Sequence, residues 1–377
     1  MNFEHTESRR MLADMLGRFL DERYSFEERN GIAYSEHGYS HELWGELADL
    51  GIVSALFEEA DGGLGGAGFD LAVVFEALGR ALVVEPFLNV LLAGKLIAGR
   101  GNDEQKRYLA QMMAGTCIPA FAHYEPAGRY ELQHVETTAR AAGGGFILDG
   151  HKAVVCFGDR CDLVVVSART DGESDAVNGV SLFVLPADTS GLRIRGYGNV
   201  DGGRSAELHF DSVTLDSEHL LGAIGDAHPH IEEAVAAGVL ALSAQSLGAM
   251  EMAKDATVEY FKVRQQFGVP IGKFQALQHR MADILLEIEQ SRSAVINAAN
   301  ALAAGRQARE RAVSAAKYTV GRVGSLIAEE TVQMHGGIGV TWELPLSHYA
   351  KCLTMIDHQL GDEDHHLQRF IDLGQSH

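Results

Sequence analysis

The sequence contains few cysteines, few prolines and few aromatic residues for a chain of 377 residues. Its four cysteines are scattered and none belongs to a C-x-x-C pair, so a disulfide framework or a zinc ribbon is not expected. With seven prolines and no low-complexity tract, the chain also lacks the composition of a disordered or fibrous protein. Each cysteine is therefore expected to be a small buried apolar residue in a reducing cytoplasm.

Positive charge is scarce too, because 31 Lys and Arg residues face 52 Asp and Glu residues, a formal net charge of −21. Such a surface repels phosphate backbones and anionic lipid, so nucleic-acid binding is not expected and any nucleotide cofactor needs locally placed donors. No run reaches about 18 uninterrupted apolar residues, and the charged stretch MNFEHTESRRMLADML lacks the apolar core of a signal peptide. We therefore expect a cytoplasmic protein without membrane insertion.

The hydrophobic pattern divides the chain into three zones. Residues 1–115 repeat apolar positions at intervals of three and four, which predicts helices. Residues 116–222 contain short apolar runs separated by glycine, such as GGFILDG, HKAVVCF, CDLVVVSART and GVSLFVLP, which predict separate antiparallel strands. Residues 223–377 return to long helical periodicity. Helices and strands that are segregated in this way predict an α+β protein, mostly α, with three domains at these boundaries.

One glycine-rich segment matches a nucleotide-binding fingerprint. GLGGAG, Gly63 to Gly68, fits G-x-G-x-x-G and precedes a predicted helix. Such a fingerprint must follow a strand and lead through its helix to a second strand, and this segment has helices on both sides. We therefore interpret it as a flexible loop.

An acidic and histidine-rich stretch, DHQLGDEDHH, invites comparison with a metal site. Asp357, Asp362 and the adjacent pair His365 and His366 lack the i, i+4 histidine spacing that puts two ligands on one helix face. Asp362 more simply caps the last helix, with further acids near its positive end. No metal site is expected.

Three longer segments carry a family resemblance: LWGELADLGIVSALFEEADGGLGG, RQQFGVPIGKFQALQHRMAD and QMHGGIGVTWELPLSHYAK. They resemble acyl-CoA dehydrogenases, and the resemblance covers nearly the whole chain. RYELQHVETTAR and MIDHQLGDEDHHL are most similar to the group called pimeloyl-CoA dehydrogenase small subunit. The resemblance implies a helical N-terminal domain, a middle antiparallel β-domain and a C-terminal four-helix bundle.

The resemblance also implies a function in lipid catabolism. FAD-dependent α,β-dehydrogenation of an acyl-CoA is expected, with electrons leaving to an electron-transfer flavoprotein. The chain is expected in a tetramer, with itself or with a larger homologous subunit. Two alternatives stay open: a half-site small subunit whose partner carries the catalytic glutamate, and a cofactor-free structural scaffold.

The resemblance places one set of cofactor contacts in the C-terminal half. The fixed guanidinium of Arg264 suits the pyrophosphate. Glycines beside the cofactor let a backbone approach it closely, because they have no Cβ. Taken alone, each position also has an ordinary explanation, such as a surface ion pair or a helix stop. The set is Arg264, Phe267, Phe274, Gln275, Gln333, Gly336 and Gly337.

A second set surrounds the flavin ring in the middle domain, and here the chain departs from the family. Tyr124 replaces the usual threonine, so the ring would be held through backbone groups of His123 and Tyr124. Cys156 stands where a hydroxyl is usual, and a thiol is a weaker donor. Tyr130 replaces a serine at the acyl-CoA entry. The ring set is Phe121, His123, Tyr124, Val154 and Cys156.

The catalytic base is the least regular feature. In many members it is a glutamate six residues after the lysine of an Ala-Lys pair, which from Lys351 is Asp357. Aspartate is one methylene shorter, and a misplacement of about 1 Å can cost about 10²-fold in rate. The family's other position aligns with Gly238, which has no carboxylate. Asp357 is therefore the predicted base.

Overall fold

The computed structural model describes residues 6–375. The first five residues, on which the expectation of no signal peptide partly rests, lie outside this range. The chain packs as two compact units, and neither is continuous in sequence. The first unit contains the residues up to Asn30, Ala67–Val83 and Val239 onward, and the second contains Gly31–Gly66 and Val84–Gly238. The first and third zones of the sequence are thus divided between the units, and the middle zone lies within the second unit.

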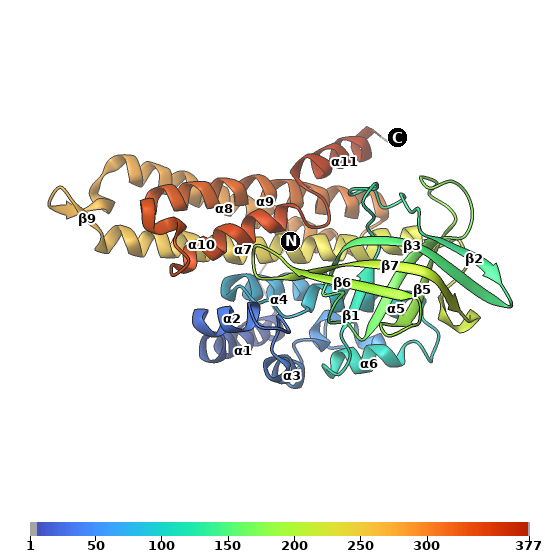
Figure 1. The fold of residues 1–377 in the computed structure, drawn as a ribbon. Helices are drawn as coiled ribbons and strands as arrows, with labels where there is room; N and C mark the ends of the chain where they lie inside the picture. Colours follow the sequence, from blue (N-terminus) through green and yellow to red (C-terminus); the bar gives the residue numbers. More distant parts are fainter. Residues whose placement is uncertain (1–5, 376–377) are drawn as a thin grey trace. The chain divides into compact units, whose positions relative to one another are not determined.

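The first unit is helical. Helix α1 begins after Thr6, whose hydroxyl accepts the backbone N–H of Arg9, and α10 begins with a proline, which lacks only an N–H that has no helical partner there. Helix α9 packs against α8, α10 and α11 (Figure 1). The helices are α1 (Glu7–Arg23), α2 (Phe26–Ala33), α4 (Gly68–Ala81), α7 (His228–Val263), α8 (Gln275–Ala301), α9 (Arg306–His335), α10 (Pro345–Asp357) and α11 (Glu363–Gln375), with α2 and α7 continuing into the second unit.

Helices α4 and α7 approach closely through glycine. A Cβ on Gly79 would lie 1.9 Å from the carbonyl oxygen of Gln245, and one on Gly248 would lie 2.0 Å from that of Glu76. Backbones this close leave no room for any side chain at the contact. The long apolar runs of the first and third zones therefore pack through small residues as well as through large ones.

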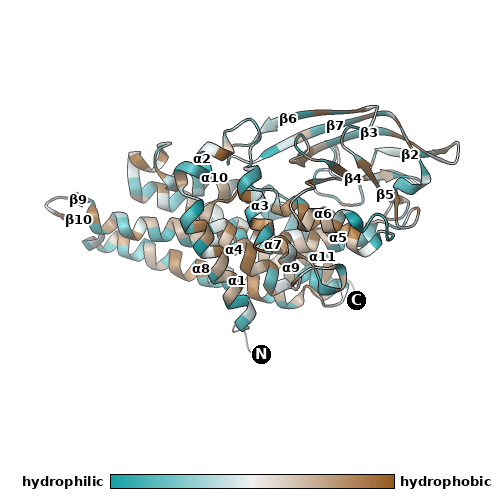
Figure 2. Ribbon diagram, turned by 90° about the horizontal axis from the view of Figure 1, so that it is seen from below, coloured by the Kyte–Doolittle hydropathy of each residue, from teal (hydrophilic) through white to brown (hydrophobic). Residues whose placement is uncertain are grey.

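Helix α7 is, among the described residues, the one helix long and apolar enough to cross a membrane by length and composition. Its most apolar stretch is 83% buried inside the structure, as in the core helices of soluble proteins. This feature therefore gives little support to membrane insertion. Most described helices carry polar and apolar positions side by side (Figure 2).

The second unit combines helices with a sheet. Within residues 6–375, eight strands form this sheet in the order β6-β7-β3-β2-β4-β5-β8, with β1 beside β4. Its apolar core includes Val164, Val166, Phe183 and Leu208. The helices are α3 (His41–Asp49), α5 (Phe87–Arg100) and α6 (Arg107–Met113), and the strands are β1 (Pro119–Ala122), β2 (Thr138–Ala142), β3 (Gly145–Cys156), β4 (Leu163–Arg169), β5 (Val180–Pro186), β6 (Leu192–Gly198), β7 (Arg204–Leu215) and β8 (Leu220–Leu221).

The sheet corrects two details of the sequence interpretation. It is mixed rather than purely antiparallel, because β1 pairs with β4 in parallel; a connection of about forty residues between them allows this. The runs GGFILDG and HKAVVCF, expected as two strands, form the single strand β3. Two register shifts, at Leu148/Gly150 and Lys152/Val155, interrupt its alternation.

The glycine-rich segment Gly63–Gly68 is a loop, as predicted. It lies between a short 3-10 turn (Glu59–Asp61) and helix α4, without a preceding strand. Gly66 has φ +80°, and a Cβ on Gly63 would lie 2.1 Å from the carbonyl oxygen of Phe57. The glycines therefore serve a tight turn of the chain itself.

The close contact of α4 and α7 generates the first prediction. Gly79→Ala should lower the free energy of unfolding by about 1–3 kcal/mol, because the two backbones must separate. Gly17→Ala in α1 is the matched control, since a Cβ there meets nothing within 4 Å. It should be neutral or stabilising by about 0.5–1 kcal/mol. Urea unfolding followed by circular dichroism measures both, and equal effects would contradict this packing.

Candidate functional site

A strained hairpin follows the C-terminal end of α7 in the first unit. Strands β9 (Gln265–Gln266) and β10 (Val269–Pro270) are joined by Phe267 and Gly268, which have φ of +52° and +79°. A two-residue hairpin turn of this kind needs positive φ at both residues, and that conformation is unfavourable for a bulky residue such as phenylalanine. Phe267 is also 93% exposed. The structure therefore presents this ring to the surroundings of the chain at an energetic cost.

Other predicted cofactor residues lie next to this hairpin. The rings of Phe267 and Phe274 are 6.1 Å apart, edge to face. Phe274 and Gln275 form the start of helix α8, where free backbone N–H groups and the helix dipole favour an anion. Arg264 is exposed, and within residues 6–375 no side-chain ion pair of Arg264 is found. One end of the helical unit thus offers a cation, a helix N-terminus and two aromatic faces.

The predicted glycine pair lies at the end of α9. Gly336 has φ +68° and ψ −147°, a conformation that is essentially restricted to glycine. Gly336 and Gly337 are exposed, and a Cβ on either would meet no atom of this chain within 4 Å. Gln333, one turn earlier, is exposed as well. The space beside this backbone is therefore open to another molecule.

The ends of α7 and α9 are joined by one aromatic pair. The rings of Tyr260 and His335 stack with centroids 4.3 Å apart, and the Tyr260 hydroxyl donates to the His335 carbonyl over 3.3 Å. Arg264 follows Tyr260 by one helical turn, and Gly336 follows His335 directly. The structure thus brings the two predicted cofactor segments, which are distant in sequence, to the same end of the helical unit (Figure 1).

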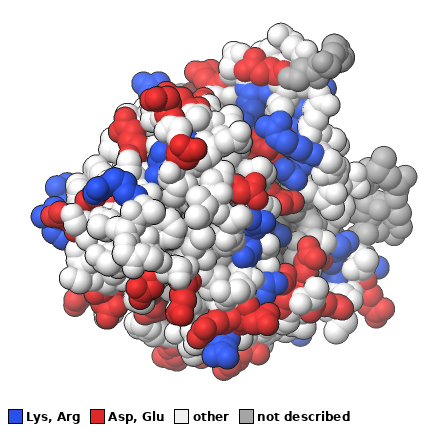
Figure 3. All heavy atoms as spheres, turned by 90° about the vertical axis from the view of Figure 1, so that its right-hand side faces the viewer, with Lys and Arg blue, Asp and Glu red and all other residues white. Residues whose placement is uncertain are grey.

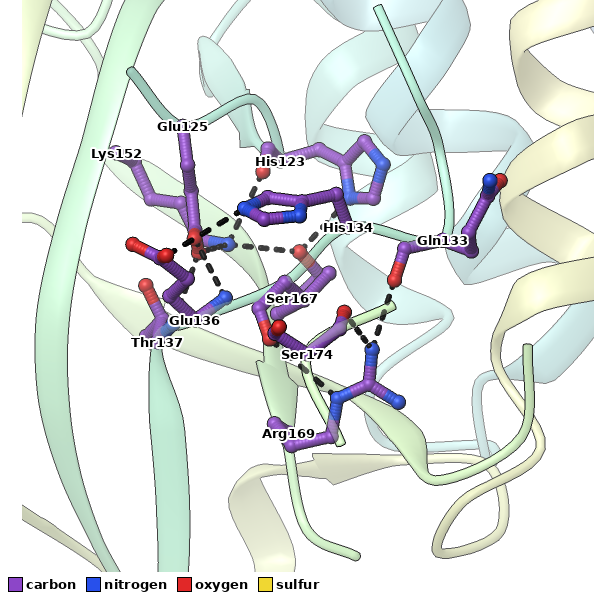
Figure 4. A network of polar contacts seen from close by, with 11 residues as sticks. His123, Glu125, Gln133, His134, Glu136, Thr137, Lys152, Ser167, Arg169 and Ser174 are labelled. Atoms are coloured by element: carbon purple, nitrogen blue, oxygen red, sulfur yellow. Dashed lines mark hydrogen bonds and ion pairs between the residues drawn. The ribbon is translucent and has the colours of Figure 1, made fainter. Parts of the chain in front are cut away.

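In the second unit, a buried ion pair fixes the end of β1. The Lys152 ammonium donates to the Glu125 carboxylate over 2.6 Å, to the His123 carbonyl over 3.0 Å and to the Ser167 hydroxyl over 3.1 Å (Figure 4). Both charged side chains are almost fully buried. Burial lowers the pKa of Lys152 to about 8 despite the opposing effect of Glu125. Burial alone would raise the pKa of Glu125, but Lys152 brings it below its usual value.

The same carboxylate closes the loop that carries Tyr130. Glu125 accepts the backbone N–H groups of Glu136 at 2.6 Å and Thr137 at 3.0 Å. The Arg169 guanidinium donates to five backbone carbonyls, including those of Gln133 in the same loop and Ser174 (Figure 4). The predicted acyl-CoA entry is therefore a loop whose ends are fixed by two buried side chains.

The structure brings the predicted ring residues of β1 and β3 together. The backbone N–H of Ala153 donates to the Tyr124 carbonyl over 2.9 Å, beside the Lys152 contact with His123. Val154 has φ +53° and is 59% exposed, which is a marked outlier for a β-branched residue. Burial, and then Asp201, raise the pKa of the Cys156 thiol to about 11. The Cys156 thiol is thus protonated at neutral pH and is a weak hydrogen-bond donor. Phe121, the remaining residue of the predicted ring set, is buried.

Asp357 is the last residue of α10 and is 8% exposed. Its carboxylate lies against α9, since a Cβ on Gly321 would lie 2.2 Å from Oδ1, and Oδ1 has no hydrogen-bond partner among the described residues. The ammonium of Lys317 donates to the backbone carbonyls of Asp357, over 2.8 Å, and Gly361. Burial raises the pKa of Asp357, although Lys317 lowers it.

The histidine-rich end of the chain serves local structure. Oδ1 of Asp362 accepts the backbone N–H of His365 over 2.9 Å, so the predicted cap of α11 is confirmed. His366 is buried between the Ser314 hydroxyl at 3.3 Å and the Leu360 carbonyl at 3.0 Å.

A different group, Glu125, His134 and Glu136, could supply metal ligands, because three of its ligand atoms lie within 4.8 Å of one another. Glu125 already accepts from Lys152 and two backbone amides there.

Sequence inspection missed the buried cations Lys152, Arg169 and Lys317. A charged residue inside an apolar strand, as in HKAVVCF or LVVVSART, was the available signal for the first two. A lysine or arginine in a strand is almost never fully buried unless it is paired. The pattern could have indicated a buried partner but not its identity, because Glu125 lies 27 residues away from Lys152.

Comparison with known proteins places three family models along the chain. The acyl-CoA dehydrogenase N-terminal domain matches residues 6–116, the middle domain matches residues 120–213 and the C-terminal domain matches residues 229–364. The matches follow one another in the family's order. They cover both cofactor segments and Asp357.

Individual relatives agree. A short-chain specific acyl-CoA dehydrogenase of Megasphaera elsdenii is 30% identical over 359 residues, covering 90% of this chain and 92% of that protein. A chain of the electron transferring flavoprotein structure from Acidaminococcus fermentans superposes with a TM-score of 0.91 at 30% identity, covering 100% of both chains. A chain of the ChsE4-ChsE5 complex from Mycobacterium tuberculosis gives 0.90 at 26% identity, with 100% of both covered.

The buried pair of the second unit generates a stability prediction. Lys152→Met keeps most of the side-chain volume but leaves the Glu125 charge buried without its cation. We expect a loss of about 3–5 kcal/mol in the free energy of unfolding. Lys262→Met is the matched control, because the Lys262–Glu259 pair is mostly exposed and contributes about 0.2–1 kcal/mol. Urea unfolding measures both, and similar losses would contradict a special role for Lys152.

Proposed function

Because this chain belongs to the acyl-CoA dehydrogenase family, we propose that it catalyses FAD-dependent α,β-dehydrogenation of an acyl-CoA thioester. The observation that carries the proposal is the succession of three family domains over residues 6–364. Dehydrogenases named among the relatives favour this function over the half-site subunit and the scaffold. The pimeloyl-type subgroup stays a prediction.

The residues of the helical unit fit the cofactor that the family generally binds. We assign the FAD pyrophosphate to Arg264 and the N-terminus of α8, because both favour phosphate oxygens. Phe267 and Phe274 would contact the nucleotide through apolar faces. The open backbone at Gly336 and Gly337 supports the close approach that a cofactor requires. Backbone groups of His123 and Tyr124, held by Lys152 and Ala153, would face the flavin ring.

Bound FAD would supply the acceptor for the hydride that leaves the substrate β-carbon. The chain must supply a base for the α-proton, which is only weakly acidic, and we assign this role to Asp357. Its burial supports the assignment, because desolvation raises the pKa of a carboxylate and makes it a stronger base. The Lys317 ammonium fixes the turn after Asp357 through two carbonyls and so limits the positions that the carboxylate reaches.

We further propose two kinds of partner. An electron-transfer flavoprotein would collect the electrons, which agrees with the Acidaminococcus structure to which this chain is similar. This chain or a larger homologous subunit would complete a tetramer, and the similarity to a chain of the ChsE4-ChsE5 complex supports assembly with another subunit. Interspersed acidic and basic side chains on the face in Figure 3 suit a cytoplasmic protein without nucleic-acid binding.

The cofactor assignment predicts bound flavin. The purified protein should be yellow and carry FAD, and Arg264→Gln should weaken FAD binding about ten- to hundredfold, as expected for a lost charge-assisted contact. Arg10→Gln in α1 is the control, since Arg10 is exposed and lies in neither cofactor segment. FAD titration followed by fluorescence quenching measures the dissociation constant. A colourless protein that binds no added FAD would refute the assignment.

The base assignment predicts loss of substrate-dependent flavin bleaching. Asp357→Asn should abolish bleaching by acyl-CoA under anaerobic conditions while FAD stays bound. In the wild type, the bleaching rate should fall as the pH drops through the raised pKa of Asp357, because only the ionised carboxylate accepts a proton.

The exposed Asp364 provides the matched control for this experiment, and Asp364→Asn should bleach like the wild type. Unchanged bleaching in Asp357→Asn would leave Asp357 a structural residue against Gly321. A wild-type chain that binds FAD but bleaches only after a second subunit is added would assign the base to that subunit.

A further inference from the structure

Trp342, which follows the turn after the glycine pair, contacts helix α10 through its backbone carbonyl and its ring. The carbonyl of Trp342 accepts a hydrogen bond from Nε2 of His348 over 3.0 Å. The rings of Trp342 and His348 meet edge to face with centroids 4.8 Å apart. The Lys351 ammonium lies 4.2 Å from the centre of the indole ring, within cation–π range. Three contacts from two residues of α10 therefore converge on Trp342.

Trp342 is well placed to control the glycine backbone. A single 3-10 segment, Gly336–Val340, connects the end of α9 to Thr341 and Trp342. Gly336 and Gly337 are exposed and have the conformational freedom of glycine, so their own side chains cannot fix the turn. The turn has local hydrogen bonds, such as that from the Thr341 N–H to the Ile338 carbonyl, and its two ends are fixed by the Tyr260–His335 stack and by Trp342.

The His348 contact has a defined tautomer because of a buried arginine. NH1 of Arg29 lies 3.4 Å from Nδ1 of His348, and both side chains are almost fully buried. A guanidinium only donates, so Nδ1 accepts and the ring proton must be on Nε2, which faces the Trp342 carbonyl. Arg29 is itself held in place by the Leu82 carbonyl over 3.2 Å. Burial first, and then Arg29 and Lys351, lower the pKa of His348, so the ring is neutral at pH 7.

We propose that His348 is a positioning residue for the cofactor, which acts by holding Trp342 and thereby the Gly336–Gly337 backbone in the conformation that faces FAD. Arg29 selects the tautomer and Lys351 fixes the indole ring. The inference rests on the proposed function, because it takes these glycines as FAD contacts.

The test compares three substitutions in α10 by FAD titration of the full chain freed of flavin. His348→Leu removes the donor and should weaken FAD binding about tenfold, which corresponds to about 1.4 kcal/mol. His348→Gln restores a neutral donor and should recover most of the affinity. Tyr349→Phe is the matched control, because Tyr349 is also buried in α10 and donates to the Arg80 carbonyl rather than to the turn. It should lower thermal stability without changing FAD affinity.

A second measurement in the flavin-free protein separates this inference from the proposed function. The chain has two tryptophans, of which Trp44 is 1% and Trp342 is 49% exposed, so iodide quenching reports mainly on Trp342. His348→Leu should increase quenching, and Tyr349→Phe should not. Increased quenching in a chain whose wild type binds no FAD would support the attachment and refute the cofactor assignment. Wild-type FAD affinity in folded His348→Leu, or equal weakening in Tyr349→Phe, would overturn the inference.

Discussion

The buried ammonium of Lys152 is the constraint on which the β-rich unit depends. A charge removed from water must be fully satisfied, and here a carboxylate, a hydroxyl and a backbone carbonyl share that task. The carboxylate is Glu125, which in turn closes the loop before β2 through two backbone amides. The end of β1, the middle of β3 and the entry loop are therefore held by one pair. A change at Lys152 would disturb all three elements together.

Other buried cations also hold backbone segments by donating hydrogen bonds to carbonyl groups. Arg169 gathers five carbonyls around the loops next to β4, Lys317 holds two carbonyls of the turn between α10 and α11, and Arg29 fixes His348. Basic side chains are fewer than acidic ones in this chain, which has a net charge of −21, and several of the basic side chains are buried. Each one stabilises an irregular backbone segment, where regular hydrogen bonding cannot satisfy the carbonyls.

Several non-glycine residues have a strained backbone conformation with positive φ. Non-glycine residues with positive φ include Arg129 beside Tyr130, Val154 on β3, Phe267 in the hairpin and Leu360 in the turn after Asp357. Such conformations persist only where the surrounding structure enforces them, and they concentrate at functional sites. These four positions lie beside the segments predicted for the acyl-CoA entry, the flavin ring, the cofactor and the base, whereas Leu82 and Ser212 lie outside them. Positive φ is therefore found both at predicted site segments and at other turns of the chain.

The sequence by itself determined the class of fold and the family, and it predicted the residues of a cofactor site. Periodicity separates helices from strands because it reflects which face is buried, and motifs such as RQQFGVPIGKFQ keep the predicted cofactor residues next to one another. The helix cap at Asp362 and the loop Gly63–Gly68 were also predicted from residues close by in the sequence. Each of these features depends on neighbours within a few residues.

Only the tertiary structure decided the rest. The parallel pairing of β1 with β4, the Lys152–Glu125 pair and the Arg29–His348 contact join residues that are tens to hundreds of positions apart. The seat of Asp357 against Gly321 likewise depends on how α9 packs against α10. A sequence pattern reports that a side chain is buried, but the identity of its partner is fixed only when distant segments pack together.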